Sequence, residues 1–143
     1  MNEYFMKIAF EEADKAYKKG EMPVGAVIVK NGKIIGMGYN KKEKSKNALM
    51  HAELIAIKKA CKKNKDWRLN ECVMYVTLEP CLMCMGAIAE SRIKKIYCGI
   101  KNNKSNLYNV NICSVENIKI EYGILENDIK KQVGKFFNNI RKQ

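Results

Sequence analysis

Apolar residues recur every three or four positions near both ends of the chain and in its middle, which is the spacing of an amphipathic helix. The pattern predicts a first helix over residues 3–19, ended by Gly20, and a second over residues 52–63. A third helix is expected from about Cys81 to Ser91. The last helix carries an apolar stripe made of Leu125, Ile129, Val133, Phe136, Phe137 and Ile140. At least one of the rings of Phe136 and Phe137 is expected to pack in the core.

Runs of β-branched and other apolar residues predict strands between these helices. Two of the runs flank Asn31-Gly32, the strongest short-range signal of a β-hairpin. The almost unbroken apolar run 72–78 ends before Pro80 and is typical of a strand buried on both faces. The expected strands cover residues 24–29, 34–38, 72–78, 96–100 and 118–122.

The order of the elements decides the fold class. Helix–strand–strand–helix–strand–helix–strand–strand–helix predicts an α/β fold in which a mixed sheet carries helices on both faces. The chain of 143 residues has the length of one domain, and no linker or repeat divides it. Residues 1–143 are therefore expected to form a single domain. The Asn- and Lys-rich segment 101–117 has no readable pattern.

Charge and composition limit the partners and the location. The 27 Lys and Arg against 15 Asp and Glu give a net charge of +12, which is typical of proteins that bind nucleic acid. All but three of the cations are lysine, so a compositional bias towards Lys, Asn and Ile explains the charge equally well. No apolar run approaches the ~18 residues of a membrane helix, and no secretory signal is recognisable. We expect a cytoplasmic protein without a membrane segment.

Two short motifs carry the candidate chemistry. Four of the six cysteines stand singly among apolar residues, whereas Cys81 and Cys84 form Pro-Cys-x-x-Cys at a helix start. Cysteines at i and i+3 on a first turn face the same way, and the helix N-terminus favours the metal-binding thiolate. His51, the one histidine, also begins a helix. Two thiolates and an imidazole are typical of a Zn²⁺ site, and a three-ligand zinc leaves a position for water.

Glu53 has the placement of a proton carrier in such a site. It lies two residues after His51, where it can accept a proton from a zinc-activated water and pass it to a substrate. His-x-Glu with Pro-Cys-x-x-Cys is the signature of zinc nucleobase deaminases. The alternative without catalysis is that the histidine packs in the core and the Cys-x-x-Cys is an unrelated structural motif.

Beyond these motifs, most of the chain resembles the bacterial tRNA-specific adenosine deaminases of the TadA type, which convert the wobble adenosine of an anticodon to inosine. The resemblance implies a three-layer α/β/α fold with a five-stranded mixed sheet, as in cytidine deaminases, and a homodimer that binds the tRNA anticodon stem-loop. It implies that His51, Cys81 and Cys84 hold one Zn²⁺ per subunit, with Glu53 catalytic. The matching segments are Met22–Val27, Gly38–Asn40, His51–Glu53, Tyr75–Cys84, Ser91–Ile93 and Gly123–Leu125, with Phe136 and Phe137.

The same resemblance implies that Asn40 and the backbone at Ala52 bind the substrate base. It also implies a phosphate-contacting role for the basic side of the last helix, for which an ordinary solvated face is the alternative. Segments 47–50 and 101–106 depart from the family pattern and are expected to border the active site. The last helix offers Lys130, Lys131, Lys135, Arg141 and Lys142 opposite its apolar stripe.

Two other functions remain open from the sequence. Within the same chemistry, the substrate is a free base, nucleoside or nucleotide such as guanine, cytosine or deoxycytidylate. An enzyme of that kind would close a lid over its site, whereas a tRNA enzyme needs an open pocket. In a different class, the chain is a catalytically silent, zinc-stabilised RNA-binding module, in which Glu53→Gln would change nothing but local charge.

Overall fold

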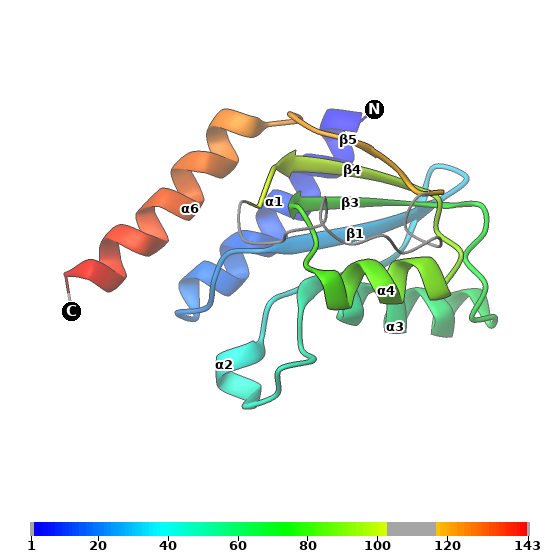
Figure 1. The fold of residues 1–143 in the computed structure, drawn as a ribbon, viewed down its shortest axis with the longest axis horizontal. Coiled ribbons are helices and arrows are strands. Elements are labelled where there is room, and N and C mark those ends of the chain that lie inside the picture. Colours follow the sequence, from blue (N-terminus) through cyan, green and yellow to red (C-terminus); the bar gives the residue numbers. More distant parts are fainter. Residues whose placement is uncertain (1, 103–116, 143) are drawn as a thin grey trace.

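The computed structural model describes residues 2–102 and 117–142 and places a five-stranded mixed sheet between two layers of helices (Figure 1). The strand order is β2-β1-β3-β4-β5. β1 is antiparallel to both of its neighbours, whereas β3, β4 and β5 run parallel. The α/β fold class and the three-layer arrangement are confirmed. The strands are β1 (Gly25–Lys30), β2 (Lys33–Tyr39), β3 (Cys72–Leu78), β4 (Lys95–Ile100) and β5 (Lys119–Glu121).

The strands lie close to the ranges that the local sequence patterns predict. Asn31 and Gly32 have φ values of 50° and 75°, which are the positive angles that a tight hairpin between β1 and β2 requires. β3 lies in the middle of the sheet and is buried along almost its whole length, as its apolar run predicts.

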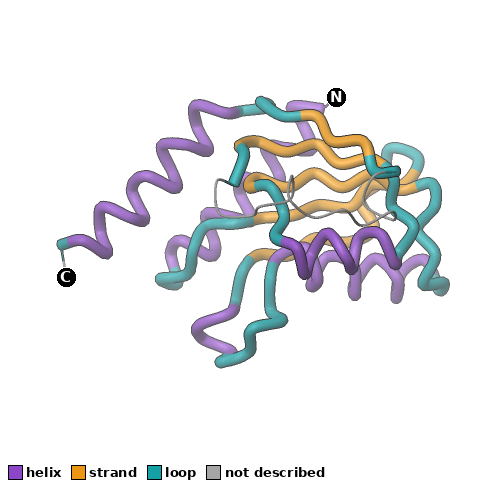
Figure 2. Tube along the Cα trace, in the orientation of Figure 1, coloured by secondary structure: helices purple, strands orange, loops and turns teal. Residues whose placement is uncertain are grey.

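The helices cover the two faces of the sheet (Figure 2). α1 and α6 pack on one face around Phe5, Met6, Val27 and Ile129. α3 and α4 lie side by side on the other face, above the larger core cluster. The short α2 lies outside the sheet, after β2. The helices are α1 (Asn2–Lys18), α2 (Lys42–Ser45), α3 (Ala52–Asn64), α4 (Leu82–Glu90) and α6 (Glu126–Arg141).

The backbone of α3 lies in direct contact with the backbone of β2, because two residues of the strand are glycines. A Cβ atom built on Gly36 would lie 2.4 Å from the carbonyl oxygen of Ala56, and one on Gly38 would lie 2.7 Å from Ile55 Cγ2. Only glycine allows this contact, so the position of α3 on the sheet depends on both residues.

Some sequence expectations were wrong in extent. The helix Lys42–Ser45 was not predicted, since four polar residues carry no periodicity. The last strand is shorter than residues 118–122. We expected at least one ring of Phe136 and Phe137 to pack in the core, but neither belongs to a core cluster and Phe137 is 38% exposed. Most of segment 101–117, including Cys113, lies outside the described residues.

Candidate metal centre and active-site pocket

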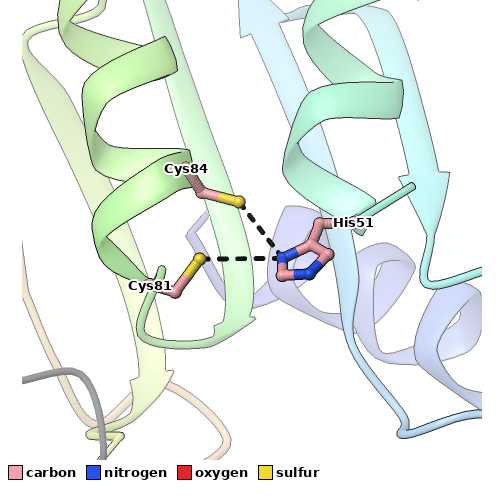
Figure 3. A group of neighbouring side chains, drawn as sticks. All are labelled: His51, Cys81 and Cys84. Carbon is pink, nitrogen blue, oxygen red and sulfur yellow. Dashed lines mark hydrogen bonds between the residues drawn. The ribbon is translucent and has the colours of Figure 1, made fainter. Parts of the chain in front are cut away.

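The two sequence motifs meet where α3 and α4 begin. His51 directly precedes α3, and Cys81 directly precedes α4, each with an extended backbone conformation at the cap position. Cys84 follows on the first turn of α4. Figure 3 shows both sulfur atoms pointing from α4 towards the His51 ring. Because α3 and α4 pack side by side with the same direction, their N-terminal ends bring the three side chains together.

The spacing of the three donor atoms suits a zinc ion. The Sγ atoms of Cys81 and Cys84 lie 3.7 and 3.4 Å from His51 Nδ1. Zn–S and Zn–N bonds of about 2.3 and 2.0 Å at tetrahedral angles put sulfur and nitrogen about 3.5 Å apart. Among the described residues, this is the one group of three or more such side chains whose ligand atoms converge, all within 4.8 Å of one another.

The two thiols are coupled by a hydrogen bond that shifts their pKa values in opposite directions. A hydrogen bond from the Cys84 thiol, helped by the Cys84 and Met83 backbone N–H groups and by His51, lowers the pKa of Cys81 to about 5 despite its burial. The same hydrogen bond, together with burial, raises the pKa of Cys84 well above its usual value. A cation is needed to hold both sulfurs as thiolates, which is what a bound metal provides.

Glu53 is a buried carboxyl group beside this centre. It is 3% exposed, and burial, reinforced by the charge of Cys81, raises its pKa to about 7. Its interaction with the Cys84 thiol opposes that rise. A carboxyl group with a pKa near 7 both accepts and releases a proton at neutral pH, as a general acid–base catalyst must.

A pocket of ≈ 380 Å³ opens onto the centre and is lined by His51, Glu53, Cys81, Ala52 and Asn40. All the site residues expected from the sequence except the buried Cys84 therefore line it. Asn40 is held by two backbone bonds: its Nδ2 donates to Met22 O at 3.2 Å and its Oδ1 accepts from Lys42 N at 3.0 Å. Ala52 begins α3, so its backbone N–H has no partner within the helix.

Two buried acids in the pocket wall were missed by sequence reasoning. Glu21 is 1% exposed and accepts hydrogen bonds from the backbone N–H groups of Glu43 and Lys44 at 2.9 and 2.8 Å, which hold α2 in place. Glu79 is 2% exposed and accepts from Tyr122 Oη and from the Asn102 backbone N–H. Glu79 precedes Pro80 in the motif, but its partners are distant in sequence.

The last helix forms one side of the same pocket. Phe136, Phe137 and Ile140 line it, which explains why the end of the apolar stripe stays out of the core. The five basic residues noted on this helix are exposed. Segment 47–50 packs by backbone bonds just before His51, and Leu49 is 58% exposed.

Residues 1–100 match the cytidine and deoxycytidylate deaminase zinc-binding region. The chain belongs to this family. It is a hydrolytic deaminase, and the family's metal is zinc, in agreement with the donor atoms. The resemblance drawn from the sequence is confirmed by relatives that match along nearly the whole chain.

One such relative is the tRNA-specific adenosine deaminase of Streptococcus pyogenes, 40% identical over 98% of this chain and 92% of its own length. A structure from work on tRNA:A34 deaminases, which edit A to I at the wobble position of transfer RNA, superposes with a TM-score of 0.82. That match has 30% identity and covers 90% of this chain and 98% of the other. Guanine deaminase from Bacillus subtilis is 40% identical with a TM-score of 0.65, but over only 69% and 64% of the two chains.

Proposed function

We propose that this protein hydrolyses adenosine to inosine at the wobble position of tRNA anticodons. The observation that carries the proposal is the His51–Cys81–Cys84 centre with buried Glu53 at the floor of an open pocket, in a chain that matches tRNA-specific adenosine deaminases almost end to end. His51 and Cys81 stay partly exposed, so the described part of the chain leaves the centre accessible to a nucleoside that remains attached to RNA.

We assign one Zn²⁺ per subunit to His51, Cys81 and Cys84. Zinc held by these residues would lower the pKa of a water molecule to about 7 and so supply, at neutral pH, a nucleophile for the carbon that bears the amine. The two thiolates and the imidazole are fixed by the first turns of α3 and α4, so the protein presents the ligands without rearrangement.

Glu53 is the catalytic acid–base residue of this proposal. Its carboxylate accepts the proton of the attacking water and delivers a proton to N1 of the purine. It then takes the proton of the hydroxyl group now on C6 and transfers it to the departing amine. The C6–N bond breaks, C6 becomes a carbonyl carbon, and adenosine and water become inosine and ammonia. Burial supports this task, since it places the pKa of the carboxyl near 7.

Asn40 and Ala52 are assigned to the base. The backbone bonds of Asn40 leave one amide N–H and one lone pair of the carbonyl oxygen for a purine in the pocket. The Ala52 N–H lies at the helix end beside the metal centre, where a ring nitrogen or oxygen of the base can accept from it. A pocket of ≈ 380 Å³ has the size of a small-molecule site and accommodates one nucleoside.

The remaining parts of the proposal concern assembly and location. We infer a single domain over residues 1–143, a homodimer and a cytoplasmic location. RNA binding by this enzyme is supported by its relatives, which are tRNA-specific adenosine deaminases. In the part of the chain that the structure describes, no helix is long and apolar enough to span a bilayer.

The test uses zinc-loaded protein and an anticodon stem-loop with adenosine at the wobble position. Inosine is scored by mass or sequencing, and Glu53→Gln is the matched inactive variant. Free adenosine, guanine, cytosine and deoxycytidylate are run alongside with ammonia release as the readout. Inosine in the stem-loop alone supports the proposal, and ammonia from a free base with an untouched stem-loop overturns it.

A further inference from the structure

A second hollow adjoins the active-site pocket. It has a volume of ≈ 280 Å³ and shares Glu21 and Asn40 with the pocket, so the two are separated by the segment that follows β2. Its other walls are basic or hydroxylated. We call it the lysine hollow; its residues are Lys19, Tyr39, Lys41, Lys44 and Ser45.

Two of the three lysines of the hollow lie against one aromatic ring, that of Tyr39. Lys19 Nζ donates a hydrogen bond to Tyr39 Oη at 2.6 Å and lies 5.0 Å from the ring centroid. Lys41 Nζ lies 4.9 Å from the same centroid. Both ammonium groups therefore lie within 5.0 Å of the same ring centroid, and the Lys19 hydrogen bond lowers the pKa of Tyr39.

The wall between hollow and pocket is held by hydrogen bonds from two side chains to the backbone. Glu21 bonds to the backbone at Glu43 and Lys44, and Asn40 bonds to the backbone at Lys42. Glu21 is the one carboxylate that lines the hollow, and both of its oxygens accept backbone N–H groups. Three ammonium groups against one carboxylate leave the hollow with an excess of positive charge.

We propose that the lysine hollow binds a phosphodiester group of the polynucleotide whose target nucleoside occupies the adjacent pocket. The inference rests on the proposed function and adds a subsite to it. A nucleoside that enters the pocket beside Asn40 carries its flanking phosphates to the rim, where the lysine hollow begins. Ammonium and hydroxyl groups are the donors that proteins use for phosphate oxygens.

The test compares two double variants that lose the same charge. Lys19→Gln/Lys41→Gln empties the hollow of two cations. Lys33→Gln/Lys63→Gln removes two exposed lysines remote from the hollow. Lys33 begins β2, about 20 Å from Tyr39 along the strand. Lys63 lies in the last turn of α3, next to Asn64, which accepts a hydrogen bond from Lys30 at the same end of the sheet. Both are loaded with zinc, checked by thermal unfolding, and titrated with a stem-loop that already carries inosine, so that no turnover occurs.

Loss of one phosphate contact lowers the slope of log affinity against log salt by about 0.7 for single-stranded nucleic acid, which corresponds to about 5-fold weaker binding at 0.1 M salt. We expect this change for the hollow variant and not for the control. In turnover, KM rises about 5-fold while kcat is unchanged. Equal effects of the two double variants, or no effect of either, would overturn the inference, as would a wild-type protein that binds no stem-loop.

Two further arms identify the source of the phosphate and separate the two proposals. The first arm compares inosine 5′-monophosphate with inosine as competitors. If the monophosphate competes better, and if the hollow variant alone loses that advantage while its stem-loop affinity stays unchanged, the ligand is a free nucleotide and the proposal of a polynucleotide ligand is overturned. Wild-type protein that binds the stem-loop through the hollow but forms no inosine refutes the proposed function and keeps the subsite. If both double variants form inosine equally well and with equal KM, the phosphate subsite is refuted and the proposed function is kept.

Discussion

A single added methyl group on β2 is expected to disturb the catalytic centre through the backbone of α3. In Gly36→Ala, the new Cβ would lie 2.4 Å from Ala56 O and 2.7 Å from Ala60 N, about 1 Å short of the distance at which ordinary contact begins. Both obstacles are backbone atoms, so no side chain can rotate away. α3 must shift by roughly this amount, and it carries Glu53 on its first turn and His51 at the position directly before it.

We expect two measurable consequences. Overpacking at such a site costs about 1–3 kcal/mol of unfolding free energy, measurable by urea denaturation. A misplacement of about 1 Å at the chemistry lowers the deamination rate by about 100-fold. Gly86→Ala is the matched control on α4, where an added Cβ meets nothing within 4 Å. Because it replaces a glycine inside a helix, it stabilises by about 0.5–1 kcal/mol and leaves the rate unchanged.

The outcome that would refute this reasoning is a Gly36→Ala protein with the unfolding free energy and deamination rate of the wild type. Damage of equal size in Gly86→Ala would also contradict it. Either result would mean that the contact between α3 and β2 does not position His51 and Glu53.

Three other predictions concern the site and its neighbour. Glu53→Gln lowers deamination by about 10²–10⁴-fold while metal analysis still finds one zinc per chain, because the change removes the proton carrier and none of the three ligands. Cys84→Ser loses zinc, whereas Cys61→Ser, away from the centre on α3, retains it; equal zinc in both would contradict the ligand assignment. Lys19→Gln raises the pKa of Tyr39, because the ammonium group that stabilises its phenolate is gone. Ultraviolet titration against a Tyr39→Phe reference measures the shift. An unchanged pKa of Tyr39 would exclude the hydrogen bond from Lys19 in solution.

Much of the fold was readable from the chain because its signals are local. Asn31-Gly32 predicts its hairpin by backbone preference alone, and the apolar run 72–78 predicts a central strand. The convergence of the three candidate ligands could be predicted for a similar reason: His51 is the one histidine, and Cys81 and Cys84 lie on one turn of a helix.

What the sequence did not predict depends on contacts between distant segments. Glu21 and Glu79 are buried because backbone N–H groups far along the chain satisfy them, and no local pattern announces such partners. α2 is a four-residue helix held by Glu21 rather than by its own periodicity. The rings of Phe136 and Phe137 continue an apolar stripe that is typical of core residues, but they line the pocket. α6, which carries them, extends past the sheet (Figure 1).

The most direct test of the central claim is turnover of a wobble-adenosine stem-loop by zinc-loaded wild-type protein, with Glu53→Gln as the paired control. The account predicts inosine at that one position with the wild type, a rate at least about 100-fold lower with the variant, and no ammonia from free adenosine, guanine, cytosine or deoxycytidylate. An unedited stem-loop together with ammonia from a free base would contradict it.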